Sequence, residues 1–363
     1  MTTSTTPAST ASAPAAPFVE PLAGDGPTPE RTSDGAFVRQ RNWFNTRFGP
    51  GPDQAPVEPG RYFILGSLGC GWARRQNILL RLLGLTEAVP FYLLTGKDEV
   101  GLVIAQDNDL RQRFGYDHLN GFYERTDPTY QGRATSPTVI DGQTGLVVSN
   151  NYHLLPQDWE TVWRPYHRPD APDLYPSDLR QQIDLLNQQI FDDVNNGTYK
   201  VVFARGEAAA KVAFDVYYAR LADYDFRLST RRYLFGDRLT DSDVRLFQTL
   251  SSFERSYRPA LAERFGEAAT KQVWDFPHLW DYARDLFAQG LADQQEQYYL
   301  GWAPDQSGQY LARSGFGPKG YELRPPAETL AAWSEPVDRS GLVGSPEAPG
   351  PGGGGSAERW TFA

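Results

Sequence analysis

The spacing of hydrophobic residues changes near residue 170, and this change divides the chain into two kinds of structure. Upstream, "GRYFILGS" at 60–67 and "AVPFYLLTG" at 88–96 are short apolar runs bounded by glycine or proline, which is typical of buried strands. Between them, "WARRQNILLRLLGL" at 72–85 carries isoleucine and leucine at helical spacing, with Gly84 as its C-terminal stop. A strand, a helix and a second strand predict the start of a βαβ unit.

A hairpin and a long connection complete this first half. "SPTVIDGQTGLVVSN" at 136–150 places two short β-branched runs on either side of the turn "DGQTG", which predicts a β-hairpin. Residues 95–134 are polar, irregular and longer than an ordinary connection, so we expect them to line a site.

Beyond about residue 170 the apolar residues recur at intervals of three and four, which is the period of amphipathic helices. Thr240 and Asp243 are spaced as a capping box at the start of one helix. The predicted helices cover 178–197, 208–228, 239–257 and 276–289. The expected organisation is a disordered tail at 1–35, an α/β domain at 36–165, an all-helical domain at 170–315 and an extended Gly/Pro-rich tail at 316–363.

Composition narrows the classes of function. The chain has 363 residues, which is enough for two domains, and its 40% hydrophobic and 22% charged residues are ordinary for a soluble globular protein. A net charge of −10 argues against a nucleic-acid partner, which requires a basic face. No apolar run reaches about 18 residues and the N-terminus lacks a secretory signal, so we expect a cytoplasmic protein without a membrane partner.

The chain contains one cysteine, Cys70, in the stretch "GSLGCGWARR". It falls just after a predicted strand and at the start of a predicted helix, where free N–H groups and the helix dipole stabilise a thiolate. Such a position is expected to lower a thiol pKa into the range ~3.5–7.5, and Arg74 and Arg75 would add positive potential. The position predicts a nucleophilic thiol, whereas the alternative is an ordinary buried core cysteine.

The surroundings of Cys70 indicate which chemistry a reactive thiol would perform. The resolving position of a C-x-x-C motif is occupied by Ala73, so a mixed disulfide on Cys70 needs a second small thiol to release it. Ser136 and Pro137 begin the predicted hairpin, where a proline is either a plain turn residue or a cis-proline. In thioredoxin-like folds a cis-proline loop faces the active thiol.

The cysteine at the strand–helix turn and the Ser-Pro hairpin are followed by "NNGTYK" at 195–200, "YLFGDRLTDSDVRLF" at 233–247 and "QYY" at 297–299. Together, over roughly residues 36–315, these features resemble the Xi-class glutathione transferases, also called glutathionyl-hydroquinone reductases. It implies the glutathione transferase fold, which is an α/β thioredoxin-like N-terminal domain followed by an all-α C-terminal domain. It also implies a homodimer and no metal.

The resemblance implies a reaction and its residues. A cysteine thiolate attacks the sulfur of a glutathionyl-hydroquinone, releases the hydroquinone and is freed by a second glutathione. The family's Cys-Pro-Trp-Ala-His-Arg motif aligns with residues 70–75, which keep the catalytic Cys70 and the thiol-binding Trp72 and Arg75.

The family's tyrosines near the acceptor align with Tyr199 and Tyr298, whose phenols would donate to a quinol oxygen as negative charge develops. Tyr299 follows in the acceptor pocket. Packing at a helix end is the alternative for Tyr298 and Tyr299.

Several thiol-binding positions depart from the family pattern. The family's Ser-Asn-Glu-Ser is "SNNY" here, so Asn151 and Tyr152 replace the residues that hold the γ-glutamyl group. The family's Gly-Trp pair reads Gly101-Leu102 in this chain, so Leu102 stands in place of the tryptophan. In addition, Gly71 and Arg74 replace a proline and a histidine of the family motif. We therefore expect a low-molecular-weight thiol as co-substrate, either glutathione or a thiol without a γ-glutamyl group such as mycothiol. The excess of arginine over lysine, typical of GC-rich genomes, is consistent with mycothiol.

Two other functions remain open at this point. The chain could be a transferase-fold enzyme of natural-product biosynthesis that adds or removes a thiol, or a non-catalytic ligand-binding homologue. The presence of Cys70 at the helix start argues against the second. In each case we expect the partner to be a small aromatic or quinone-like molecule.

Overall fold

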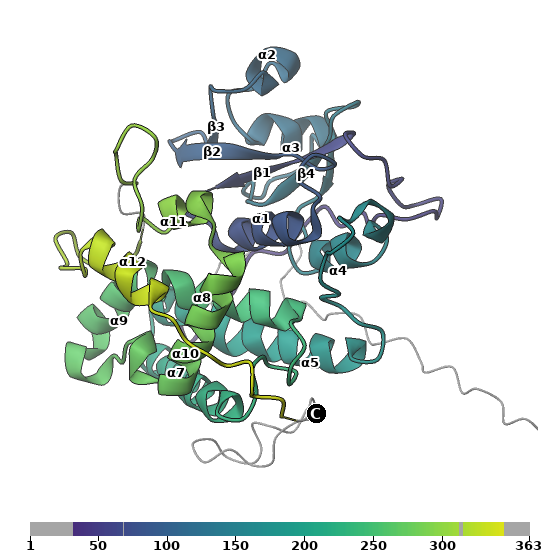
Figure 1. Cartoon of the computed structure of the whole chain (residues 1–363). Helices are drawn as coiled ribbons and strands as arrows, with labels where there is room; N and C mark the ends of the chain where they lie inside the picture. The colour runs from purple at the N-terminus through teal and green to yellow at the C-terminus, as the bar shows by residue number, and fades with distance from the viewer. Residues whose placement is uncertain (1–31, 68, 312–314, 345–363) are drawn as a thin grey trace, which may run out of the picture.

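The computed structural model describes residues 32–67, 69–311 and 315–344, in which a mixed β-sheet stands on a larger body of helices (Figure 1). The sheet has the strand order β3-β2-β1-β4-β5. Its central strands β1 and β2 are parallel, and all the other neighbours are antiparallel. The strands are β1 (Tyr62–Ser67), β2 (Phe91–Lys97), β3 (Leu102–Ile104), β4 (Thr138–Asp141) and β5 (Val147–Ser149).

The helix α1 (Gly71–Leu83) connects β1 to β2 and confirms the predicted βαβ start. It begins after Cys70, whose backbone is extended, and ends at Gly84, whose φ of 76° is the left-handed conformation that glycine adopts easily. β1 is buried on both faces, because Ile64 packs in the core that contains α1 while Phe63 and Leu65 pack in a second core on the opposite face. This explains the continuous apolar run of β1.

The predicted hairpin is β4 and β5, which pair in antiparallel register. The connection at 95–134 contains more structure than the sequence predicted. It forms β3, α2 (Leu110–Phe114) and α3 (Asn120–Thr126), and the last two contribute Leu110 and Phe122 to the second core. These elements are only three to seven residues long, which is too short for a hydrophobic period to be visible in the sequence.

The helical part packs under the sheet, with α1 between them (Figure 1). One hydrophobic core runs from α1 into the helical part, and α1 contacts both α4 and α8. Among the described residues no helix is long and apolar enough to cross a bilayer. The helices are α4 (Leu155–Glu160), α5 (Arg180–Ile190), α6 (Gly197–Phe203), α7 (Glu207–Leu228), α8 (Asp241–Ser256), α9 (Arg258–Phe265), α10 (Pro277–Leu286), α11 (Gln294–Tyr299) and α12 (Pro326–Ser334).

The central helix α8 has the predicted capping box. Asp243 Oδ2 accepts the backbone N–H of Thr240 at 2.8 Å and its hydroxyl at 3.0 Å. Asp243 Oδ1 accepts from the Leu234 N–H and from the Tyr282 hydroxyl, both at 2.9 Å. Burial nevertheless raises the pKa of Asp243 to about 6, because the carboxylate is fully enclosed. The capping residue therefore ties α8 to α10 as well as starting the helix.

The region after 316 corrects the sequence prediction of an extended tail. Residues 326–334 form α12, and Trp333 on this helix is 3% exposed. Its ring packs against Trp302 at a centroid distance of 4.7 Å and against Trp280 at 4.9 Å. The glycine and proline content around the helix hid it, although a single buried tryptophan anchors it. The predicted tails at 1–31 and 345–363 lie outside the described residues.

Candidate active site

Cys70 lies directly before α1 and lines a cavity of about 840 Å³. The walls come from the segment before β1, from the ends of β1 and β2, from the loop before β4 and from α6. Thr95, Asn120 and Ala134 also line it, so the 95–134 segment borders the cavity as predicted. Of the residues predicted for the site, those that line this cavity are Cys70, Trp72, Leu102, Ser136, Tyr152 and Tyr199.

The loop before β4 faces the thiol. The Ser136–Pro137 peptide bond is cis, which confirms the cis-proline interpretation. The Cys70 thiol donates to the Ser136 carbonyl oxygen over an Sγ···O distance of 3.2 Å. The Ser136 hydroxyl in turn accepts the N–H of Ser67, at the end of β1, at 2.8 Å. The thiol is therefore held between the start of α1 and the cis-proline loop, while Pro137 itself is buried behind the cavity wall.

The electrostatics of the thiol correct the sequence prediction. Burial raises the pKa of Cys70 above its ordinary value, although the backbone N–H groups of Ala73 and Trp72, the Ser136 contact and the charge of Arg39 oppose this. The expected lowering was wrong because the cost of burying a thiolate exceeds the help from the helix start. Arg74 supplies little of the expected potential, because its Nε lies 2.6 Å from Glu296 Oε1 in α11.

Aromatic rings form one wall of the cavity, called the aromatic wall below. Trp72 stacks on Tyr152 with ring centroids 4.7 Å apart and on Tyr199 at 6.2 Å. The Tyr199 hydroxyl accepts from the Tyr257 hydroxyl at 3.2 Å. Burial raises the pKa of Tyr199, so its phenol stays protonated and able to donate at neutral pH. A flat ligand placed beside Cys70 would meet these rings.

Arg39 is a cavity residue that the sequence analysis missed. It lines the cavity, and its guanidinium lies 4.3 Å from the centroid of the Tyr199 ring and 5.0 Å from that of Trp72. Its Nε donates to Asn196 Oδ1 at 3.0 Å. The available signal was the aromatic and basic run "FVRQRNWF" at 37–44, which precedes the first predicted strand and carries no motif of its own.

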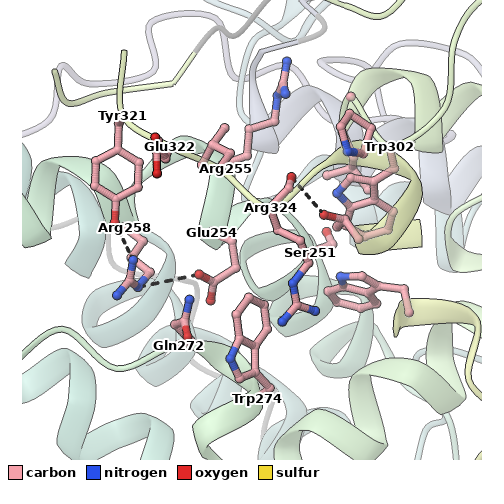
Figure 2. A pocket seen from close by; sticks show the side chains of 16 residues that line it. Ser251, Glu254, Arg255, Arg258, Gln272, Trp274, Trp302, Tyr321, Glu322 and Arg324 are labelled. Atoms are coloured by element: carbon pink, nitrogen blue, oxygen red, sulfur yellow. Dashed lines mark hydrogen bonds and ion pairs between the residues drawn. The ribbon is translucent and has the colours of Figure 1, made fainter. Parts of the chain in front are cut away.

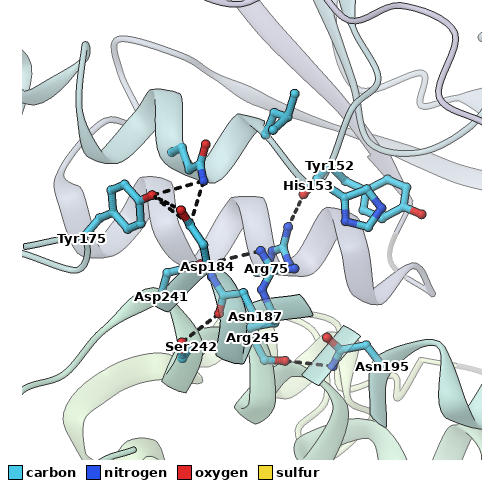
Figure 3. Close-up of polar contacts among 12 residues, drawn as sticks. Arg75, Tyr152, His153, Tyr175, Asp184, Asn187, Asn195, Asp241, Ser242 and Arg245 are labelled. Atoms are coloured by element: carbon cyan, nitrogen blue, oxygen red, sulfur yellow. Dashed lines mark hydrogen bonds and ion pairs between the residues drawn. The ribbon is translucent and has the colours of Figure 1, made fainter. Parts of the chain in front are cut away.

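Asn151 and Arg75 lie behind the cavity wall. Asn151 Nδ2 donates to Asn45 Oδ1 at 2.8 Å, and its Oδ1 accepts the His153 N–H at 3.0 Å. Arg75 is fully buried and donates to the Tyr152 carbonyl, with His153 and Arg245 nearby (Figure 3). Burial lowers the pKa of Arg75 to about 9. Arg75 thus supports the Tyr152 carbonyl and Asn151 supports the turn that follows Tyr152, and neither residue lines the cavity.

Tyr298 and Tyr299 occupy the end of α11 and do not line the cavity with Cys70. Their rings are 6.0 Å apart. Tyr299 is 6% exposed, and within the described part of the chain its hydroxyl has no hydrogen-bond partner. The structure therefore does not bring them to the thiol, and their roles at the acceptor stay predictions.

A second cavity, of about 370 Å³, lies under α12 (Figure 2). Trp274, Trp302 and Trp333 line it together with several arginines, and none of the predicted site residues does. Glu254 in this cavity accepts the Val273 N–H at 2.8 Å and lies 3.7 Å from Arg258 Nε. Burial raises the pKa of Glu254 to about 7.

Comparison with known proteins places this arrangement in a family. No protein-family model matches the chain. Glutathionyl-hydroquinone reductase YqjG of Escherichia coli is 31% identical over 279 residues, covering 72% of this chain and 82% of that protein. A glutathione transferase from Gordonia bronchialis has 32% identity and a TM-score of 0.66, covering 84% of this chain and 90% of the other. The Xi glutathione-S-transferase of Phanerochaete chrysosporium has 25% identity and a TM-score of 0.67, covering 81% and 96%.

The fold and these relatives define a glutathione transferase-like, thiol-dependent reductase with a thioredoxin-like sheet followed by a helical domain. This confirms the fold class that the sequence predicted. The chain belongs to the Xi-class glutathione transferases, the family of the glutathionyl-hydroquinone reductases.

Proposed function

We propose that Cys70 is the nucleophile of a reductase that removes a small thiol from its conjugate with a hydroquinone or a related aromatic compound. The observation that carries this proposal is the position of the thiol. It lies before α1, 3.2 Å from the Ser136 carbonyl and inside a cavity that is also lined by the stacked pair Trp72 and Tyr199. The conjugate is a small thiol whose sulfur is bonded to an aromatic ring. It would fit in this cavity between the cis-proline loop and the rings of Trp72 and Tyr199.

The proposed reaction consists of two successive displacements at sulfur. In the keto tautomer of the conjugate, the carbon that bears the sulfur also holds a proton. The Cys70 thiolate attacks that sulfur, so a disulfide bond forms and the sulfur–carbon bond breaks. The electron pair moves into the ring, which leaves as a hydroquinone anion and takes up a proton. A second thiol molecule then attacks the mixed disulfide and releases Cys70 together with the disulfide of the small thiol.

The side chains of Tyr152 and Asn151 support a proposal for the identity of the small thiol. Tyr152 is 5% exposed and stacked on Trp72, and the amide of Asn151 is already bonded to Asn45 and to backbone groups. Neither side chain offers a carboxylate to the ammonium of a γ-glutamyl group. We propose that the co-substrate is a thiol without that group, such as mycothiol. We also propose, from the family resemblance, a homodimer in the cytoplasm with domains at 36–165 and 170–315.

Replacement of Cys70 by alanine tests the nucleophile. The C70A protein is expected to lose turnover of hydroquinone conjugates by at least a factor of about 1,000, because covalent catalysis by the thiol is removed. The assay measures hydroquinone release from matched glutathione and mycothiol conjugates. Unchanged turnover in C70A would exclude a catalytic thiol, and a clear preference for the glutathione conjugate would exclude the proposed co-substrate. An inactive wild-type protein would favour the ligand-binding alternative.

A further inference from the structure

Arg39 presents an unused hydrogen-bond donor inside the cavity. Its Nε is bonded to Asn196 Oδ1 at 3.0 Å, which fixes the plane of the guanidinium. Its Nη2 is buried and, within the described residues, has no hydrogen-bond partner. A buried guanidinium N–H without an acceptor costs free energy, and an oxygen atom with negative charge is the acceptor that it binds most strongly. The site therefore contains a place for an anionic oxygen.

The position of Arg39 indicates which part of the substrate would supply that oxygen. The guanidinium lies over the Tyr199 and Trp72 rings, and the Phe37 ring is 5.5 Å from it. These rings form the aromatic wall, whereas the loop that contacts the thiol sulfur is the one at Ser136. A donor over these rings is placed to reach a substituent of an aromatic leaving group that packs against them, next to the thiol.

We propose that Arg39 is a catalytic residue that donates from Nη2 to the ring oxygen of the leaving hydroquinone. The proposal rests on the reductase function proposed above. As the sulfur–carbon bond breaks, the electron pair moves through the ring onto this oxygen, and the guanidinium neutralises the resulting charge. The substrate class is thereby narrowed to conjugates whose leaving group carries an ionisable ring hydroxyl. A disulfide substrate, whose leaving group is a thiolate, would gain little from Arg39.

The test compares two substrates of the same nucleophile in the R39Q protein. One is the conjugate of a hydroquinone with the thiol, either glutathione or mycothiol, that the wild-type enzyme turns over. The other is the mixed disulfide of that thiol with 2-mercaptoethanol. Each rate is first corrected for the fraction of Cys70 present as thiolate, measured by iodoacetamide alkylation at the same pH, because Arg39 also lowers the pKa of the thiol. After this correction, R39Q is expected to lower kcat for the hydroquinone conjugate by roughly 100-fold, and to change reduction of the mixed disulfide by less than about 3-fold. R39K should recover part of the lost rate, because it restores the charge.

Controls separate this proposal from a structural effect and from failure of the function itself. R41Q changes an exposed arginine of the same segment that does not line the cavity, and it should keep both activities. An equal loss of both activities in R39Q, or an unchanged rate on the hydroquinone conjugate, would overturn the role of Arg39.

Binding of 4-nitrophenol provides a readout that needs no turnover. The wild-type protein should shift the bound phenol toward its yellow phenolate, and R39Q should not. No turnover of either substrate by the wild-type enzyme would refute the reductase function, and an equal spectral shift in both proteins would refute the donor role of Arg39.

Discussion

Single residues decide whether the Cys70 thiol reacts. The side chain is enclosed by the start of α1, the cis-proline loop and the aromatic wall, and Arg39 brings a positive charge that acts on the thiol from the cavity side. Arg74 and Arg75, which stand next in the sequence, point into the protein and are engaged by Glu296 and by the Tyr152 carbonyl. The arginine whose charge acts on the thiol is thus distant in sequence, whereas the two arginines near it in sequence are engaged elsewhere.

The raised pKa of Cys70 predicts a pH profile. Alkylation by iodoacetamide requires the thiolate, so its rate should rise with pH and reach its half-maximal value above the midpoint measured for a free cysteine under the same conditions. R39Q should move that midpoint to still higher pH, because Arg39 lowers the thiol pKa. Cys70 is the only cysteine of the sequence, so the signal belongs to one group. A midpoint below that of free cysteine would contradict the prediction.

At the scale of elements, α1 connects the site to the helical domain. Its first residue, Gly71, is buried against Gln248 of α8, and a Cβ atom at Gly71 would overlap the side-chain amide of Gln248. Gln248 is 2% exposed, so the amide has little room to move. This packing accounts for the glycine that follows Cys70, where the family pattern has proline. The departure is a local fit between two helices.

A pair of substitutions tests this fit. G71A should destabilise the protein by about 1–3 kcal/mol, because a methyl group is forced into a filled space. In the Q248A background the same substitution should cost much less, so the double variant G71A/Q248A should be nearly as stable as Q248A alone. Urea unfolding measures both, and G341A, at a glycine whose added Cβ meets no neighbour, is the control. Additive effects of the two substitutions would show that the residues do not compete for space.

The sequence predicted the elements better than the site. Periodicity identified β1, α1, β2, the hairpin and the long helices, because each buries one regular face. The sequence also indicated Cys70 and the cis-proline loop, because each is marked by its place directly next to a predicted strand or helix. The sequence did not indicate Arg39, because this residue lies in an irregular segment whose course brings it to the cavity and which has no periodic pattern. Similarly, the inward direction of Arg75 and the absence of Tyr298 from the lining of this cavity follow from packing, which no local pattern records.

At the scale of the whole molecule, buried carboxyl groups set how stability depends on pH. Glu254 has a folded-state pKa of about 7, raised by burial above the ordinary value of 4.5. A carboxyl group with a raised pKa stabilises the fold when it is protonated, so its contribution is complete below pH 4.5 and is lost as pH rises to about 7. Asp243, with a pKa of about 6, acts in the same direction.

The variant E254Q should remove the Glu254 part of this dependence. Glutamine keeps the acceptor for the Val273 N–H and cannot ionise. The unfolding free energy of E254Q relative to the wild type should therefore increase between pH 5 and pH 8, by on the order of 2 kcal/mol. Chemical denaturation at several pH values measures the difference, and E263Q, at an exposed glutamate, is the control. A difference that stays constant with pH would contradict the prediction.

The segment before β1 has a consequence for protein engineering. Gln40 bonds it to Tyr130 and to the backbone of Arg133 on the sheet side, while Arg39 bonds it to Asn196 on the helical side. A shortened protein that began at β1 would retain all the strands and helices that the structure describes, together with Cys70, but would lack one wall of the cavity. Fusion partners and truncations should therefore leave the chain intact from residue 37 onward.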